Sequence, residues 1–143
     1  MSEEIYRWND LVKYYESRHK EVRTFPGDRV RITYDLDGRP VPVGSQVVRS
    51  SAGNPWLIIG VKVSPADKLR SRSALVANTD LPIGGLSLVG TESALRQSLP
   101  LHGLRTDDLE HVLHALTSMA VRLREVSSIE NVEIETPYAY VFH

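Results

Sequence analysis

The sequence predicts an α+β domain in which an antiparallel sheet packs against helices, in the order helix, three strands, helix, two strands, helix. Three observations support this prediction. Residues 5–15 carry apolar side chains at helical spacing, residues 29–63 alternate like strands between turn signals, and residues 106–126 form a long amphipathic stripe. We expect one domain over residues 1–143, since single domains commonly have about 100–200 residues.

The first helix is predicted from apolar residues that recur every three or four positions: Ile5, Trp8, Leu11, Val12 and Tyr15. We expect it to begin after Ser2, whose hydroxyl can accept a hydrogen bond from the first turn, and to end before Pro26. Basic residues suit the negative pole at its end: Arg18, His19, Lys20 and Arg23.

Three strands follow in the prediction. Val30, Ile32 and Tyr34 alternate with polar residues, and Asp37-Gly38 favours a type I′ hairpin turn into a strand over residues 41–49. Residues 56–63 are apolar on both alternating faces, which predicts a central strand covered on both sides.

The second half adds a helix, a hairpin and a final helix. Ser64-Pro65 predicts the start of a helix over residues 65–78, and residues 86–89 and 94–99 read as paired strands. The last helix begins at Thr106 as its cap, with charges matched to its dipole: Asp107, Asp108, Arg122 and Arg124. Its apolar stripe predicts one face of the core: Leu109, Val112, Leu113, Leu116, Met119, Ala120, Leu123 and Val126.

Composition excludes several function classes. The net charge is −1, with 17 Lys and Arg against 18 Asp and Glu, so no long-range field favours nucleic acid or an anionic membrane. There is no cysteine, which excludes disulfides, thiolate metal sites and cysteine nucleophiles. The acidic start and the short apolar runs predict no signal peptide and no membrane span, so we expect a cytoplasmic protein.

One group of residues has the spacing of metal ligands. Asp107, His111 and His114 recur at i, i+4 and i+7 of the last helix, which suits a divalent cation. Helical geometry, however, places all three opposite the apolar stripe, on the solvent side. We therefore predict no metal site and no cofactor.

Other polar motifs also have simpler explanations. Lys68, Arg70 and Arg72 form a basic stretch without interleaved aromatics, so a single-strand nucleic-acid platform is not predicted. Gly84-Gly85 follows a proline turn and precedes a strand, which indicates turn chemistry and not a phosphate loop. Paired carboxylates fall at helix starts or on an outward strand face: Glu3-Glu4, Asp107-Asp108 and Glu133 with Glu135. No hydrolase motif is present, and no catalytic residue is predicted.

Residues 127–143 extend beyond the last helix, and we expect them to form a strand. Tyr138, Tyr140 and Phe142 share one parity in this tail. The strand would pack on its own domain or pair with a neighbouring protomer or partner by strand addition, and both alternatives remain open.

The element order and a few short motifs resemble a known family. Asp80-Leu81-Pro82-Ile83-Gly84-Gly85-Leu86-Ser87-Leu88, Leu99-Pro100-Leu101 and the closing amphipathic helix are similar to type III secretion chaperones and to the YbjN-like bacterial proteins. The resemblance covers about residues 4 to 126. It implies a non-catalytic domain that binds another polypeptide and forms a homodimer. It does not identify the residues that contact the partner.

The predicted function is therefore that of a chaperone-like or regulatory domain that binds a polypeptide. The alternative is a small enzyme or a small-ligand-binding domain that uses the same sheet. An apolar groove with unpaired strand edges would favour the first reading, whereas a deep pocket with convergent titratable side chains would favour the second.

Overall fold

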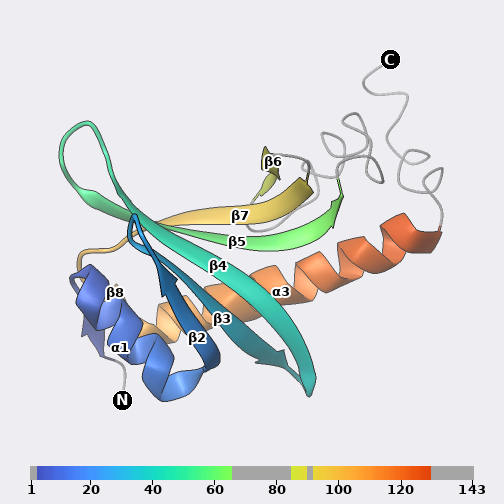
Figure 1. The fold of residues 1–143 in the computed structure, drawn as a ribbon, viewed down its shortest axis with the longest axis horizontal. Helices are drawn as coiled ribbons and strands as arrows, with labels where there is room; N and C mark the ends of the chain where they lie inside the picture. The colour runs from blue at the N-terminus through green and yellow to red at the C-terminus, as the bar shows by residue number, and fades with distance from the viewer. Residues whose placement is uncertain (1–2, 66–84, 90–91, 130–143) are drawn as a thin grey trace.

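The computed structural model describes residues 3–65, 85–89 and 92–129, and the account below concerns these residues. Their architecture is α+β: a large antiparallel sheet lies over the long C-terminal helix, with a second helix at one end (Figure 1). In chain order the elements are β1 (Glu4–Ile5), α1 (Trp8–Arg18), β2 (Lys20–Phe25), β3 (Arg29–Leu36), β4 (Arg39–Arg49), β5 (Pro55–Pro65), β6 (Gly85–Val89), β7 (Glu92–Pro100), β8 (Leu104–Arg105) and α3 (Thr106–Ile129).

The large sheet has six strands in the order β2-β3-β4-β5-β7-β6, with neighbours antiparallel throughout. The β3–β4 hairpin turns at Asp37 and Gly38, whose φ values of 50° and 90° are the left-handed pair that a type I′ turn requires. Asp35 Oδ1 accepts a hydrogen bond from the Gly38 N–H at 2.7 Å. The predicted hairpin is therefore confirmed.

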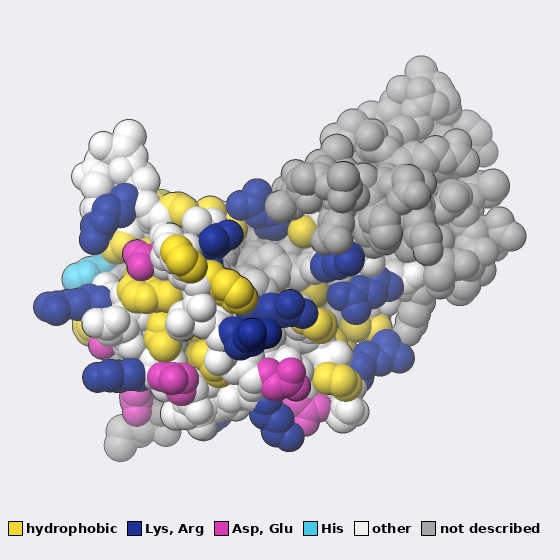
Figure 2. Space-filling model, viewed as in Figure 1, with side chains coloured by type: hydrophobic (Ala, Val, Ile, Leu, Met, Phe, Trp, Pro, Cys, Tyr) yellow, Lys and Arg dark blue, Asp and Glu magenta, His cyan; other side chains and the backbone are white. Residues whose placement is uncertain are grey.

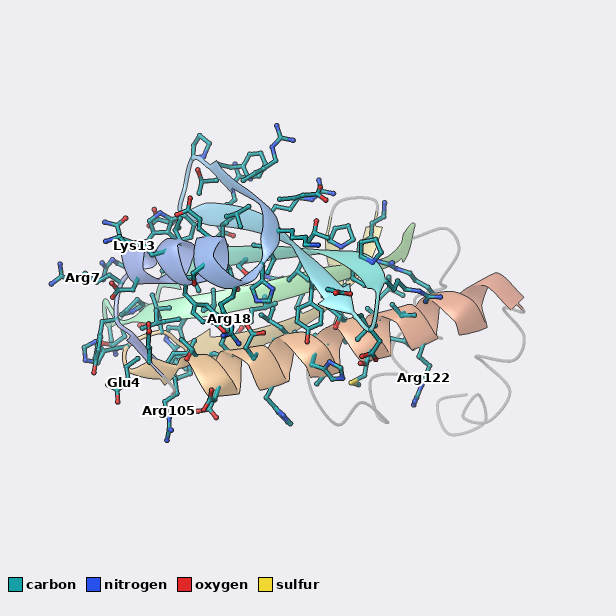
Figure 3. The ribbon with its side chains drawn as sticks, turned by 90° about the horizontal axis from the view of Figure 1, so that it is seen from below. Glu4, Arg7, Lys13, Arg18, Arg105 and Arg122 are labelled. Atoms are coloured by element: carbon teal, nitrogen blue, oxygen red, sulfur yellow. The ribbon has the colours of Figure 1, made fainter. Side chains whose placement is uncertain are left out.

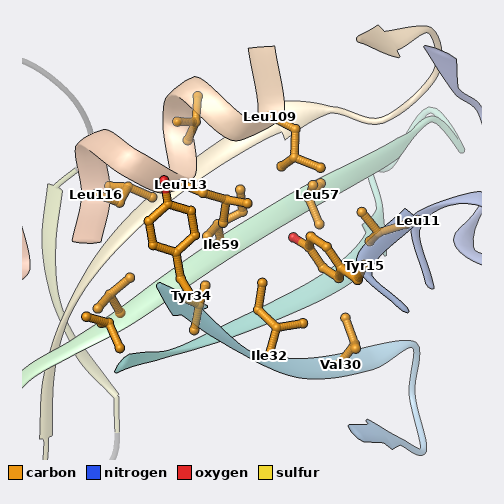
Figure 4. Close-up of a cluster of buried hydrophobic side chains, with 14 of the residues drawn as sticks. Leu11, Tyr15, Val30, Ile32, Tyr34, Leu57, Ile59, Leu109, Leu113 and Leu116 are labelled. Carbon is orange, nitrogen blue, oxygen red and sulfur yellow. The ribbon is translucent and has the colours of Figure 1, made fainter. Parts of the chain in front are cut away.

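The hydrophobic core lies between the sheet and the two helices (Figure 4). Alternate residues of the central strands point toward α3, among them Ile32, Leu57 and Ile59, which are fully buried. The apolar stripe of α3 packs against them: Leu109, Val112, Leu113, Leu116 and Ala120 are buried. Each large side chain buried in this way contributes about 1.5–3 kcal/mol, so this stripe holds α3 across the sheet.

The N-terminal segment differs from the prediction. The first helix spans only Trp8–Arg18, because His19 is extended, with φ −125° and ψ 168°, and the chain continues as β2. Ile5 lies before the helix in β1, which pairs with β8 beside the start of α3. There the Thr106 hydroxyl accepts the N–H of Glu3 at 3.0 Å. The predicted cap at Ser2 lies outside the described residues.

β5, α3 and the chain after β5 also differ from the prediction. β5 is central in the sheet as expected, but within the described residues α3 covers only one of its faces, and Trp56 on the other face is 36% exposed. Arg124 does not lie in the last turn of α3, which runs on to Ile129; it donates through Nε to the Lys62 carbonyl at 2.9 Å. The predicted helix start at Ser64-Pro65 is wrong, because both residues belong to β5 and pair with β7. The rest of that predicted helix, residues 66–78, lies outside the described residues.

The strands predicted at residues 86–89 and 94–99 are present as β6 and β7. In the part of the chain described here, neither helix is both long and apolar enough to pass through a lipid bilayer.

Candidate functional site

The face of the sheet turned away from α3 carries an open groove of about 800 Å³. β3, β4, β5 and β7 all contribute to it, because the residues that alternate with the core side chains point outward. It is lined by Phe25, Arg29, Arg31, Pro42, Gly44, Gln46, Ile58, Gly60, Lys62, Ala94, Arg96 and, from α3, Arg124. Val30, Val43 and Ser45 also border it, although their side chains are buried. We call this surface the sheet groove.

A row of directly opposed residues crosses the middle of the sheet groove. Arg31 of β3 is opposite Gly44 of β4, Gly44 is opposite Gly60 of β5, and Gly60 is opposite Arg96 of β7. Opposed residues of antiparallel strands place their side chains on the same face. Two arginines therefore flank a pair of glycines, which leaves bare backbone as the floor between them.

The fold itself does not require these two glycines. Neither has a positive φ, and a Cβ at Gly44 would lie 3.9 Å from the nearest atom, the Gly60 carbonyl oxygen. A Cβ at Gly60 would meet Arg96 Cγ at 3.8 Å, which is also an ordinary contact distance. A glycine inside a strand weakens it and often marks a place where another backbone or a ligand approaches closely.

The charge of the sheet groove is of one sign. Its described lining contains five basic side chains and no acidic one: Arg29, Arg31, Lys62, Arg96 and Arg124. Figure 2 looks onto this face and shows the Lys and Arg side chains gathered with apolar ones over its middle. In a chain whose net charge is −1, this is a local concentration of positive charge and not a property of the whole molecule.

Other basic residues lie elsewhere. Arg105 and Arg122 point away from the sheet on the side of α3, as the view from below shows (Figure 3). Both are exposed. Arg105 and Arg122 therefore serve as control positions with the same charge as the arginines of the sheet groove but outside it.

A smaller groove of about 430 Å³ lies between α1 and β2. It is lined by Trp8, Asn9, Val12, Lys13, Glu16, Thr24 and Phe25. Phe25, which is 43% exposed, borders both grooves. Apolar side chains thus continue from the sheet groove toward α1.

The two edges of the sheet differ. β2 carries a register irregularity between Lys20 and Arg23, where Glu21 has a φ of 53°, and most of its side chains are exposed. A bulge and charged side chains protect an edge from pairing with another strand. Among the strands that the structure describes, β6 forms the opposite edge, and its sequence, GLSLV, carries no charge.

A polar cluster joins the end of α1 to α3. Glu110 Oε2 lies 2.7 Å from Nε2 of His19 and accepts a hydrogen bond from the Tyr14 hydroxyl at 2.8 Å. Burial raises the pKa of Glu110, but the hydrogen bonds from His19 and Tyr14 lower it by more, so the pKa lies below its ordinary value of 4.5. Burial also raises the pKa of Tyr14 and of Tyr34.

This polar cluster does not line the sheet groove or the groove between α1 and β2. Among the described residues, every buried side-chain nitrogen or oxygen has a hydrogen-bond partner. The Tyr34 hydroxyl, for example, lies 3.1 Å from His114 Nδ1. The cluster therefore serves to fix α1 against α3.

The residues weighed as a metal site, Asp107, His111 and His114, all lie on α3. His111 and His114 are exposed on α3, and within the described residues no group of three or more His, Asp or Glu side chains is placed to hold a metal ion. Gly85 begins β6, so this residue of the predicted turn belongs to a strand. The predicted tail strand is wrong at its start, because residues 127–129 continue α3. The rest of the tail, with Tyr138, Tyr140 and Phe142, lies outside the described residues, as do Gly84 and the basic stretch at Lys68, Arg70 and Arg72.

The sheet groove was not predicted from the sequence. Its central residues, Arg31, Gly44, Gly60 and Arg96, are far apart along the chain and meet only through strand register. The signal that was present is the outward parity of Arg29 and Arg31, which alternate with the buried Val30 and Ile32.

Comparison with known proteins gives one kind of match. No protein-family model matches the chain, and no curated protein matches it. Among solved structures, a chain from the structure of the HopA1–SchA chaperone–effector complex is similar, with a TM-score of 0.59 and 15% sequence identity. The match covers 82% of this chain and 94% of that chain. The protein therefore has a type III secretion chaperone-like fold, as the sequence resemblance indicated.

Proposed function

We propose that this protein binds a segment of another polypeptide through non-covalent contacts and acts as a chaperone-like or regulatory domain. The observation that carries the proposal is the sheet groove, an open surface with a partly apolar floor on a fold similar to that of a chaperone–effector complex. Open grooves with apolar floors suit extended chains, whereas small ligands are mostly enclosed in concave pockets.

Two other surfaces support the same proposal. The groove between α1 and β2 adds apolar side chains beside Phe25. The uncharged strand β6, which among the described residues pairs only with β7, offers an edge to which a strand can be added. Apolar burial and strand pairing would then supply the affinity. The proposal involves no catalytic residue and no cofactor.

We further propose that the protein is cytoplasmic and that two copies form a homodimer, as the resemblance to secretion chaperones implies. No residue is assigned to the dimer interface. Measuring the mass of the purified full chain by light scattering over a range of concentrations tests the dimer. A mass that stays at one copy throughout would contradict it.

Peptide binding is tested with an array of unstructured peptides of unrelated sequences. We expect a subset to bind and to compete with one another for the folded protein. A photoreactive amino acid at Gln46, which lines the sheet groove, should crosslink to the bound peptides, whereas the same amino acid at the exposed His111 on α3 should not. Absence of binding across the array, or equal crosslinking from both positions, would contradict the proposal.

A further inference from the structure

The sheet groove has a shape that points to a particular kind of occupant. Arg31 and Arg96 stand three strand spacings apart across the Gly44–Gly60 floor, which is roughly 14 Å between their Cα atoms. In the plane of a sheet, one extended chain takes up about 5 Å, the spacing of neighbouring strands. A segment that runs along the strands therefore fits between the two arginines, and the glycines let its backbone come close.

The charges beside this floor select among such segments. Arg29 and Arg31 are two residues apart on β3 and point to the same side, and Arg96 faces them from β7. The next row along the sheet is Arg29, Gln46, Ile58 and Ser98, so the floor also offers an apolar contact. Arg guanidinium groups bind carboxylates through two parallel hydrogen bonds.

We infer that the sheet groove binds an extended polypeptide segment rich in Asp or Glu, with its carboxylates on Arg29, Arg31 and Arg96 and its backbone over Gly44 and Gly60. This inference rests on the proposed function and specifies its partner class. Electrostatic complementarity of this kind contributes mainly specificity and a fast association rate. Phe25 is the only aromatic side chain in the described lining of the sheet groove. A single-stranded nucleic acid would favour several aromatic side chains on which its bases can stack.

The test uses fluorescein-labelled peptides of 11 residues, the length of β4 and of β5. The peptides are identical except that alternate positions carry Glu, Gln or Lys. We expect the Glu peptide to bind about tenfold more tightly than the Gln peptide and the Lys peptide to bind most weakly. The affinity of the Glu peptide should fall as NaCl is raised from about 50 mM to about 0.5 M, because salt screens exposed charges.

Two variants locate the binding. R31E/R96E should weaken the Glu peptide about tenfold or more and improve the Lys peptide, whereas R105E/R122E, with the same change of charge outside the groove, should leave both affinities unchanged. G44A/G60A should weaken binding severalfold without lowering the melting temperature, because both Cβ atoms have room in the folded protein. The melting temperature of each variant shows that a lost affinity is not lost folding.

The outcomes separate this inference from the proposed function. If the Gln peptide binds as tightly as the Glu peptide, and R31E/R96E changes neither, the preference for acidic segments is wrong while peptide binding stands. If a single-stranded oligonucleotide of equal charge displaces the Glu peptide at lower concentration, the occupant is not a polypeptide. If none of the peptides binds and the peptide array is also empty, the proposed function is itself wrong.

Discussion

His19 and Glu110, which are 91 residues apart in the chain, meet at 2.7 Å and join the end of α1 to the first half of α3. The His19 side chain is only 7% exposed, so this contact is shielded from solvent more than a surface ion pair would be. Tyr14 donates to the same carboxylate oxygen. This contact fixes α1 at the end of the sheet where the smaller groove lies.

Replacing Glu110 by Gln should reduce the free energy of unfolding by about 1–3 kcal/mol near neutral pH, because a charged acceptor of two hydrogen bonds is lost. Urea unfolding measures the change. Glu16 is exposed on α1, so Glu16→Gln is the matched control and should change the stability by less than about 0.5 kcal/mol. Equal effects at both positions would contradict a role for the Glu110 contacts.

The same carboxylate predicts a pH dependence. Because the pKa of Glu110 is lower in the folded protein than its ordinary value of 4.5, its contribution is fully present above pH 4.5. The contribution is lost as the pH falls through the lower, folded pKa. The stability difference between wild type and Glu110→Gln should therefore shrink in acid, as measured by urea unfolding in a series of buffers. A difference that grows in acid would contradict this sign.

Tyr15 of α1 and Ser45 of β4 form a buried hydrogen bond, with 2.9 Å between their hydroxyl oxygens. Tyr15→Phe leaves the Ser45 hydroxyl without this partner and should cost about 1–3 kcal/mol of unfolding free energy. Ser45→Ala should cost a similar amount. The double variant should be less destabilised than the sum of the two, by about 1 kcal/mol, and strict additivity would show that the bond contributes nothing.

Leu113 is fully buried in the middle of the α3 stripe (Figure 4). Leu113→Ala should lower the unfolding free energy by about 2–5 kcal/mol, because it removes apolar contacts and leaves a cavity. His111→Ala on the exposed face of the same helix should stay within about 0.5 kcal/mol of wild type. Thermal unfolding of the pair measures both, and similar melting temperatures would contradict the assigned faces of α3.

Gly38 and Gly60 should respond oppositely to the same change. Gly38 has a φ of 90°, so Gly38→Ala should cost about 1 kcal/mol or more even though no atom lies within 4 Å of the new Cβ. Gly60 has ordinary strand geometry and space for a Cβ, so Gly60→Ala should be neutral or should stabilise by up to about 1 kcal/mol. A loss of stability at Gly60 would mean that the fold itself needs this glycine.

Local sequence patterns predict most of the helices and strands. The missed strand β2 shows where such patterns fail. The β3–β4 hairpin and α3 were predicted because one face of each is buried, which imposes a period on the sequence. The sequence predicts the end of the first helix where the structure has β2. Only Val22 in this strand is even half-buried, so no alternation marks it, and its conformation depends on backbone hydrogen bonds to β3.

The α+β class, the Asp37-Gly38 turn and the buried face of α3 can be predicted from the chain, since each shows in the spacing or type of residues near one another in it. The row of Arg31, Gly44, Gly60 and Arg96, and the contact of Glu110 with His19, become visible only in the folded molecule. Strand register and helix packing bring these residues together, and both are set by the burial of the whole core.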